Sequence, residues 1–349
     1  MNKVHRIDLP RIVLIGRGVL GQLGEICREL GVERALIATG RVTYGVAGGS
    51  ALDILRASGV RAKATYVTEA DLENVERVRR ETAAEGADAV VGVGGGRIID
   101  VAKLSAARSG TFFISVPTTA SHDGIASSLA SIKGLGRPYS MKAKAPIAVV
   151  ADSQIIAESP YRFTASGCGD VISKAVAVRD WRLAHEVKGE YYGDYAGSLS
   201  LMSSSLVMES AHQIRDRLEA GYRTLLEALV SCGVAMSIAG SSRPCSGSAH
   251  LFSHALDMLA SRPALHGEQC GVGTIMMAKL HGLDWRAIRE RLSIIDAPTT
   301  ARELGISRET VIEALEKAGS IRPERYTILN SVNLTAEAAE TLAEECGVI

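Results

Sequence analysis

Short apolar runs alternate with amphipathic stretches over the first 150 residues. The runs predict β-strands at Ile12–Ile15, Ala35–Ala38, Ala62–Val67, Asp88–Val93 and Phe112–Val116. Stretches of helical period lie between them, at Val19–Leu30, Ala51–Ser58, Leu72–Glu85 and Arg97–Arg108. Near-continuous apolar strands that alternate with helices are typical of a parallel sheet covered on both faces. Because crossovers between parallel strands are right-handed, we expect a doubly wound, Rossmann-like α/β layer.

From about Ser159 the strand-like runs end and long helical patterns follow. They lie at Ala165–Glu186, Tyr195–Ile214, Tyr222–Ala239 and Trp285–Leu292. A chain of 349 residues is long enough for about two domains. We therefore expect an α/β domain over residues 1–157 and an all-α domain over residues 158–349.

A basic segment, residues 132–145, lies near the end of the first half. Its cations are Lys133, Arg137, Lys142 and Lys144, with few apolar residues among them. The pattern fits a solvated hairpin or a basic lip over a cleft, and both interpretations stay open.

Composition narrows the class of protein. Lys and Arg together number 39, as do Asp and Glu, so the zero net charge gives no broad attraction to nucleic acid. The chain begins without an apolar signal-like segment, and its six cysteines form no C-x-x-C pair, which favours a cytoplasmic protein with reduced thiols. The most apolar stretch, Leu225–Gly240, is interrupted by Glu227 and small polar residues, so we expect no membrane span.

A glycine-rich motif follows the fourth predicted strand. Gly94, Gly95 and Gly96 stand between that apolar run and a helical stretch that contains Arg97 and Asp100. Glycine lets the backbone approach a ligand closely, and the amino end of a helix attracts anions, so the motif suits a pyrophosphate. It is not the Gly-x-Gly-x-x-Gly fingerprint, and a turn made of glycine for packing is the alternative.

A second polar segment follows the fifth predicted strand. Thr118, Thr119 and Ser121 carry hydroxyls that can donate to phosphate or ribose, and Asp123 can accept from a substrate hydroxyl. Ligands of open α/β sheets bind at the carboxyl ends of the strands, which favours a binding role. A Ser/Thr-rich helix cap is the alternative.

Three of the eight histidines fall in one window of the helical half. His250 and His254 are four residues apart and share a helix face, and His266 follows a Pro-containing loop. Asp170 lies in an apolar helical stretch, where an unpaired carboxylate is costly. Together these side chains suit a divalent cation, although each histidine could instead be a hydrogen-bonded core residue.

These motifs occur together in an order that resembles the iron- and zinc-dependent polyol dehydrogenase superfamily, which includes glycerol dehydrogenase and dehydroquinate synthase. The segments His122–Ser127 and His250–Leu256 are most similar to the sn-glycerol-1-phosphate dehydrogenase family. The similarity spans nearly the whole chain. It implies a dehydroquinate synthase-like fold, with a dinucleotide-binding first domain and a metal- and substrate-binding second domain.

The resemblance also assigns roles to residues of this chain. It implies Zn2+ held by Asp170, His250 and His266, and substrate contacts and catalysis by Asp123, Asp170 and His254. It implies that NAD(H) or NADP(H) is bound by Gly94, Gly95, Gly96, Arg97, Asp100, Thr118, Thr119, Ser121 and Ser127.

The implied reaction is the reversible NAD(P)H-dependent reduction of dihydroxyacetone phosphate to sn-glycerol 1-phosphate, the first step of archaeal-type ether-lipid synthesis. Three protein ligands leave zinc an open position for the substrate oxygen. We expect a small phosphorylated triose or polyol as substrate, a homo-oligomer, and no nucleic-acid partner. A glycerol dehydrogenase that acts on unphosphorylated glycerol or dihydroxyacetone is the alternative, and a metal-stabilised binding protein without turnover is a more distant one.

Two details of specificity are partly readable. Gly40 and Arg41 follow the second predicted strand, where an enzyme restricted to NAD usually has an acid, so we expect both NADH and NADPH to be used. Candidate cations for the substrate phosphate are not ranked by the sequence: His254, Lys133, Lys142, Lys144 and Arg243.

Overall fold

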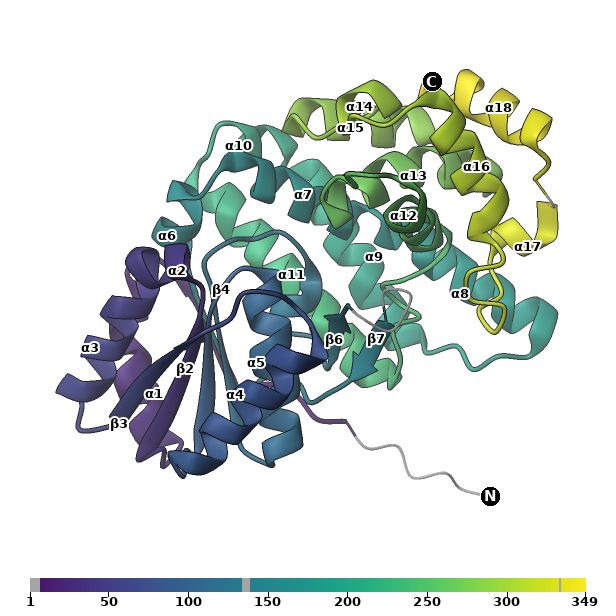
Figure 1. Cartoon of the computed structure of the whole chain (residues 1–349). Helices are drawn as coiled ribbons and strands as arrows, with labels where there is room; N and C mark the ends of the chain where they lie inside the picture. The colour runs from purple at the N-terminus through teal and green to yellow at the C-terminus, as the bar shows by residue number, and fades with distance from the viewer. Residues whose placement is uncertain (1–6, 134–138, 333) are drawn as a thin grey trace. The chain divides into compact units, whose positions relative to one another are not determined.

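The computed structural model describes residues 7–133, 139–332 and 334–349 (Figure 1). The chain forms two compact units that divide between Pro160 and Tyr161. This division lies close to the predicted boundary at residues 157 and 158. The cofactor, metal and substrate roles predicted for the two parts stay predictions.

The N-terminal unit contains a six-stranded parallel sheet in the order β1-β8-β5-β4-β2-β3. Its strands are β1 (Ile12–Gly16), β2 (Arg34–Thr39), β3 (Arg61–Tyr66), β4 (Ala89–Gly94), β5 (Phe112–Pro117) and β8 (Ala148–Asp152). The parallel sheet and its first five strands are confirmed. The prediction omitted β8, although Ala148–Ala151 is as apolar as the other runs and is fully buried between β1 and β5.

Helices cover both faces of this sheet, as predicted (Figure 1). On one face α1 (Leu23–Glu29) and α3 (Gly49–Ala57) pack against residues such as Ile37 and Val91. On the other face α4 (Leu72–Ala84) and α5 (Gly96–Ser109) pack against Leu36 and Val90. Consecutive strand residues thus point into the hydrophobic cores on opposite faces of the sheet, and both cores require apolar side chains. This explains the near-continuous apolar runs. The remaining helical elements of the unit are η1 (Val19–Gln22), α2 (Arg41–Thr43), η2 (Tyr44–Gly48), η3 (Asp123–Ile125) and α6 (Ser153–Glu158).

The basic segment lies on an antiparallel hairpin of β6 (Leu129–Ile132) and β7 (Tyr139–Lys142). Lys133, Lys142 and Lys144 are exposed, whereas Arg137 lies outside the described residues. The hairpin prediction is therefore confirmed, and a role as a lip over a cleft stays a hypothesis.

The described residues of the C-terminal unit form helices joined by loops, and no strand occurs among them. Its helices are α7 (Tyr161–Ile172), α8 (Lys174–Lys188), α9 (Asp194–Glu209), α10 (Ala211–Arg215), α11 (Glu219–Ala239), α12 (Ser248–Leu259), α13 (His266–Leu280), α14 (Trp285–Ile295), α15 (Ala301–Leu304), α16 (Arg308–Ala318), α17 (Ile328–Val332) and α18 (Ala336–Glu345). The predicted all-α character is confirmed.

Two helices predicted as continuous are each divided in the structure. Ala165–Glu186 spans the end of α7 and most of α8, with a break at Ser173, whose hydroxyl donates to the carbonyl oxygen of Asp170 at 2.6 Å. Tyr195–Ile214 spans α9 and α10, with a break at Ser210. A serine hydroxyl can replace a backbone hydrogen bond, so a helix can break at a serine. The helical spacing of the apolar residues continues across both breaks, and for that reason the sequence predicted continuous helices.

Helix α11 is long and apolar enough to cross a membrane by length and composition alone. However, 67% of its most apolar window is buried inside the protein. This burial is typical of the core helix of a helical unit.

Candidate metal and cofactor sites

The carboxyl ends of β2, β4 and β5 lie at the same edge of the sheet. Thr39 is in register with Val93, and Gly94 with Pro117. The helix after β2, α3, covers one face, whereas the helix after β4, α5, covers the other. The crossovers therefore diverge between β2 and β4, which is where doubly wound sheets bind their ligands.

The glycine motif forms the turn from β4 into α5. A side chain at Gly94 would place its Cβ 2.6 Å from Cγ1 of Ile98, and one at Gly96 would place it 1.9 Å from Nε2 of His122. Packing against Ile98 thus favours glycine at position 94, whereas a side chain at position 96 would displace the His122 ring. The turn also brings the amino end of α5, a helix of 14 residues, to this edge, as anion binding requires.

The polar segment after β5 lies beside this turn. The Thr118 amide donates to the Gly94 carbonyl oxygen at 3.1 Å, and Thr119 Oγ1 is buried without a hydrogen-bond partner among the described residues. A Cβ on Gly95 would lie 3.3 Å from that hydroxyl. The cap of the next helical turn, η3, comes from His122, whose Nδ1 accepts from the Gly124 amide at 2.9 Å. The alternative of a Ser/Thr cap is therefore not what the structure shows.

Three predicted cofactor residues contact other protein groups. The Asp100 carboxylate lies 3.2 Å from Nζ of the fully buried Lys103, and that ammonium also lies 3.4 Å from Ser127 Oγ. Arg97 donates to the Thr68 carbonyl oxygen at 2.5 Å. These contacts join α5 to neighbouring loops. A contact of Arg97, Asp100 or Ser127 with a cofactor stays a prediction.

Arg41 lies directly after β2, at the same edge. Its guanidinium carbon lies 5.6 Å from the centroid of the Tyr66 ring, and the side chain is exposed. It is therefore available to a ligand at this edge.

In the C-terminal unit, the three predicted zinc ligands converge. Ligand atoms of Asp170, His250, His266 and Cys270 all lie within 4.8 Å of one another. Nε2 of His250 lies 3.4 Å from Oδ1 of Asp170, and the His250 and His266 ring centroids are 5.0 Å apart. Asp170 lies on α7, His250 on α12 and His266 on α13. The packing of these helices brings Asp170 close to His250, although the two are 80 residues apart in the sequence.

The protonation states of Asp170 and His250 suit metal ligands. Burial alone would raise the pKa of Asp170, but the Lys174 ammonium, 2.6 Å from Oδ1, and His250 outweigh it and hold this pKa well below its usual range. Burial, and next the Lys174 charge, hold the pKa of His250 well below its usual value, so the imidazole is neutral. Metal ligands need these protonation states, an ionised carboxylate and a neutral imidazole.

Hydrogen bonding distinguishes the two histidines. His250 Nδ1 is buried and has no partner among the described residues, unlike a satisfied core histidine. His266 Nδ1 lies 3.0 Å from Ser253 Oγ, which also accepts from Gln269 Nε2 at 3.0 Å. This network orients the His266 ring and directs Nε2 toward the cluster, as the outer partners of metal-binding histidines do. The residues present therefore fit a divalent metal.

His254 lies beside the cluster and outside its ligand set, as the resemblance implies. Its ring stacks on His266 with centroids 6.0 Å apart, and Nδ1 lies 3.9 Å from Oδ2 of Asp257. The side chain is 15% exposed, so it is accessible from outside the cluster.

Close backbone packing brings Asp170 and His266 together. A Cβ on Gly267 would lie 1.8 Å from the Ser166 carbonyl oxygen, and one on Gly169 would lie 2.3 Å from the Gly267 carbonyl oxygen. Helices α7 and α13 therefore approach each other through their main chains, each glycine adjacent to one of the proposed ligands.

The sequence interpretation missed several residues of this site. They are Lys174, Ser253, Asp257, Gln269 and Cys270. Helical spacing carried a signal, because Asp170 and Lys174, and likewise His266 and Cys270, are four residues apart and share a face.

Arg243, a candidate for phosphate binding, is engaged elsewhere. It is buried, donates to both carboxylate oxygens of Glu190, and donates from Nη1 to the Tyr326 carbonyl oxygen at 2.9 Å. Glu190 follows the carboxyl end of α8, whereas Lys174 begins that helix of 15 residues. A helix of this length spans ~22 Å, so Arg243 lies far from the cluster.

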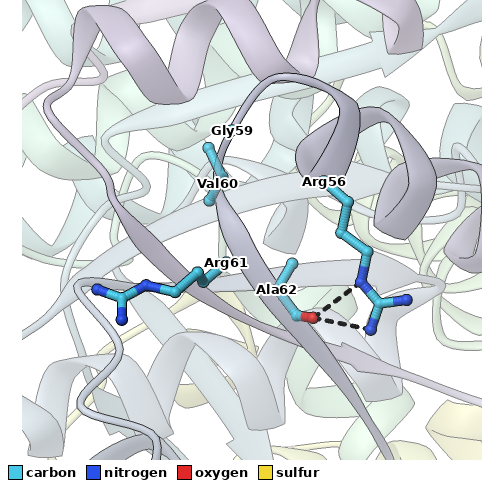
Figure 2. Close-up of a pocket in the computed structure, with 5 residues that line it drawn as sticks. All are labelled: Arg56, Gly59, Val60, Arg61 and Ala62. Atoms are coloured by element: carbon cyan, nitrogen blue, oxygen red, sulfur yellow. Dashed lines mark hydrogen bonds between the residues drawn. The ribbon is translucent and has the colours of Figure 1, made fainter.

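A surface depression near the amino ends of the strands is lined by no residue predicted to bind the cofactor, metal or substrate. Figure 2 shows Arg56 donating from Nε and Nη2 to the Ala62 carbonyl oxygen, at 3.2 and 3.1 Å, near the amino end of β3. Its other lining residues are Gly59, Val60 and Arg61. The arginine fork ties α3 to β3 and is a structural contact.

Comparisons with known proteins give consistent matches. A family model described as iron-containing alcohol dehydrogenase matches residues 14–160. The chain is 53% identical over 348 residues to glycerol-1-phosphate dehydrogenase (NAD(P)+) of Thermococcus kodakarensis, covering 99% of both chains. It is 52% identical to the protein of that name from Methanothermobacter thermautotrophicus, again over 99% of both chains.

Solved structures share the fold at low sequence identity. Glycerol dehydrogenase from Schizosaccharomyces pombe matches with a TM-score of 0.81 at 18% identity, covering 99% of this chain and 92% of that one. A probable glycerol dehydrogenase from Sinorhizobium meliloti matches with a TM-score of 0.77 at 22% identity, covering 98% of each chain. The predicted fold class is therefore confirmed.

Proposed function

The chain belongs to the glycerol-1-phosphate dehydrogenase (NAD(P)+) family of oxidoreductases, and we propose that it reversibly reduces dihydroxyacetone phosphate to sn-glycerol 1-phosphate with NADH or NADPH. One observation carries the proposal. A chain about half identical to these relatives over its full length brings Asp170, His250 and His266 together in one buried cluster.

The metal we propose at this cluster is Zn2+. Asp170, His250 and His266 would hold it, and the convergence of their ligand atoms and the oriented ring of His266 support that assignment. When bound, the ion supplies a Lewis acid for the substrate oxygen. Lys174, through its ion pair with Asp170, keeps that carboxylate ionised and oriented.

For the cofactor, we infer binding at the carboxyl edge of β2 and β4. Gly94–Gly96 and the amino end of α5 would receive the pyrophosphate, and Thr118, Thr119 and Ser121 would donate to phosphate or ribose. The buried, unpartnered hydroxyl of Thr119 supports this role. The absence of an acid between Gly40 and Tyr44 and the exposure of Arg41 support acceptance of NADPH as well as NADH.

His254 and Asp123 are the proposed proton-handling residues. The position of the His254 ring supports such a role, because an imidazole that stacks on His266 and is 15% exposed can exchange protons between the cluster and solvent. His254, Lys133, Lys142 and Lys144 stay candidates for binding the substrate phosphate, and His254 stacks on His266 of the metal cluster. Asp123 would contact a hydroxyl of the polyol.

The product, a phosphorylated glycerol of sn-1 configuration, would feed ether-lipid synthesis of the archaeal type. We infer a cytoplasmic location, which the burial of all six cysteine side chains supports. We also propose a homo-oligomer.

A spectrophotometric assay tests the activity. Full-length protein supplied with Zn2+ and NADPH should oxidise the cofactor with dihydroxyacetone phosphate much faster than with dihydroxyacetone. In the reverse direction it should act on sn-glycerol 1-phosphate and not on the sn-3 enantiomer. Preference for the unphosphorylated substrates would establish the alternative, a glycerol dehydrogenase. Retained zinc without turnover of any ketose would establish a binding protein.

A further inference from the structure

We propose that Lys103 is a positioning residue of the cofactor site. Its buried ammonium holds residues 124–131 against α5, the helix whose amino end is the proposed site of the pyrophosphate. The proposal rests on the cofactor site of the proposed function, and it adds a residue that acts through the backbone of a neighbouring segment.

The hydrogen bonds of Lys103 carry this inference. The side chain is fully buried, and Nζ donates to the carbonyl oxygens of Gly124 at 2.7 Å and Leu129 at 2.6 Å. The carboxylate of Asp100, with Oδ1 at 3.2 Å, is the third partner. An ammonium has three N–H donors, so these partners occupy all of them, and the Ser127 hydroxyl at 3.4 Å makes only a longer contact. Lys103 therefore has no donor left for a cofactor or substrate and acts through the segment that it holds.

Asp100 completes the attachment of this segment. It is 5% exposed, and its second oxygen, Oδ2, accepts from the Ser131 amide at 3.1 Å. Asp100 and Lys103 lie on the same face of α5, one helical turn apart. Their hydrogen bonds reach Gly124 at one end of the segment and Ser131 at the other. The buried pair thus fastens residues 124–131 to the helix at both ends.

The segment carries residues of the proposed site. Asp123, the proposed contact of the polyol, directly precedes it, and Ser127, a proposed cofactor residue, lies inside it. The backbone of residues 126–128 forms neither helix nor strand, so the contacts of Lys103 supply order that regular backbone hydrogen bonds supply elsewhere. Gly96, where α5 begins, lies about two turns before Lys103, or ~10 Å along the helix axis. One helix therefore sets the position of Asp123 and Ser127 relative to the pyrophosphate site.

Stability alone does not account for a buried pair of charges. Burial removes both charges from water, and apolar side chains of similar volume are often at least as stabilising as a buried ion pair. Directed hydrogen bonds instead fix one arrangement of the backbone that they hold. Removal of Lys103 should therefore impair cofactor binding by the folded protein, beyond any effect on its stability.

The variant K103M tests this role, because methionine fills much of the same volume without donating a hydrogen bond. The Kd of the folded variant for NADH, measured by the fluorescence of the bound nicotinamide, should rise by about tenfold or more. Hydrogen–deuterium exchange of the full-length protein should become about tenfold faster or more at the amides of residues 124–131 and stay unchanged in β4 and β5. A wild-type value of either the Kd or the exchange rate would overturn the proposal.

The matched control is S105A. Ser105 is also fully buried on α5, but its hydroxyl donates to the Val75 carbonyl oxygen on α4 at 3.0 Å. S105A should keep the wild-type Kd for NADH and the wild-type exchange of residues 124–131. A rise of the Kd in S105A equal to that in K103M would mean that any weakening of α5 impairs the site, and it would reject a specific role of Lys103.

The double variant D100N/K103M covers the case that K103M does not fold, since it leaves no unpaired charge buried beside α5. It should fold and show the same faster exchange of residues 124–131. Wild-type exchange in the double variant, or failure of both variants to fold, would assign Lys103 to the fold alone and overturn the proposal.

Cofactor binding and hydrogen exchange do not require turnover, so they separate this proposal from the proposed function. If K103M showed the expected changes but the wild type did not reduce dihydroxyacetone phosphate, Lys103 would keep its role at a cofactor site and the proposed activity would be rejected. If the wild type reduced dihydroxyacetone phosphate and K103M bound NADH as the wild type does, the activity would stand and the role of Lys103 would be rejected.

Discussion

Asp170 is the residue on which the metal cluster depends most. It is the single carboxylate of the cluster, is 1% exposed, and contacts both Lys174 and His250. D170N keeps the side-chain shape but removes the charge that balances Lys174 and a dication. We expect loss of most activity and a fall of more than about 100-fold in Zn2+ affinity, measured by competition with a chelator.

The matched control for D170N is D296N. Asp296 is exposed and has a positive φ of 68°, a conformation that asparagine tolerates equally well. Its substitution should change neither activity nor zinc affinity. Full activity of a metal-depleted D170N sample would contradict the proposed mechanism.

Arg41 is the residue expected to decide how well NADPH is used. R41A should raise KM for NADPH by about tenfold and leave KM for NADH nearly unchanged, because only NADPH carries a 2′-phosphate that a guanidinium can pair. Steady-state kinetics with both cofactors measures the effect. R61A is the control, since Arg61 is an exposed arginine at the amino end of β3, the opposite edge of the sheet (Figure 2). Equal changes for both cofactors would reject the assignment.

Helices α7 and α13 hold the metal cluster together through glycine contacts. G267A would force the new Cβ into the Ser166 carbonyl oxygen, so the helices must separate and carry Asp170 away from His266. Overpacking of a well-packed contact typically lowers the free energy of unfolding by about 1–3 kcal/mol, and we expect a loss of at least this size. We also expect weaker zinc retention. Urea denaturation and metal analysis measure the two effects.

G319A is the control for G267A, since a Cβ at Gly319 makes only ordinary contacts of 3.5 Å or more. Its zinc content should equal that of the wild type. If G267A retained zinc at full stability, the close contact would not be what positions the cluster.

Most elements were predictable because burial on both faces of a parallel sheet leaves a strong apolar signal. The breaks at Ser173 and Ser210 were not, since the helical period continues through them. Asp170, His250 and His266 were found from residue chemistry and family resemblance. Lys174, Asp257 and Cys270 were missed for a common reason. In the sequence, a charged residue that contacts the cluster looks like an exposed one, and a cysteine beside the cluster looks like any other core residue. Only the packing of α8, α12 and α13 shows what each contacts.

At the scale of the whole molecule, buried thiols make the stability depend on pH on the alkaline side. All six cysteines are buried. Burial raises the pKa of Cys27 to about 12 and that of Cys346 to about 11, and it raises the pKa of Cys168 as well. In the unfolded chain these thiols titrate near their usual value of about 8.5.

Stability should therefore decline on the alkaline side. Below about pH 8.5 the thiols are protonated in both states and the stability is fully present. As pH rises toward the folded-state values, the unfolded chain loses protons first, so each buried thiol lowers the free energy of unfolding by up to ~1.4 kcal/mol per pH unit. Urea midpoints of the reduced protein between pH 7.5 and 9.5, about the range in which tyrosines stay protonated, measure this slope.

The double variant C27A/C346A separates thiol ionisation from lost packing. It should be less stable than the wild type at neutral pH, because buried volume is removed. Its free energy of unfolding should nevertheless fall less steeply toward pH 9.5, because two fewer thiols contribute to the slope. V311A removes a fully buried apolar side chain without a thiol and should keep the wild-type slope. Identical slopes in the double variant and the wild type would contradict this prediction. They would mean that burial does not hinder ionisation of these two thiols in the folded protein.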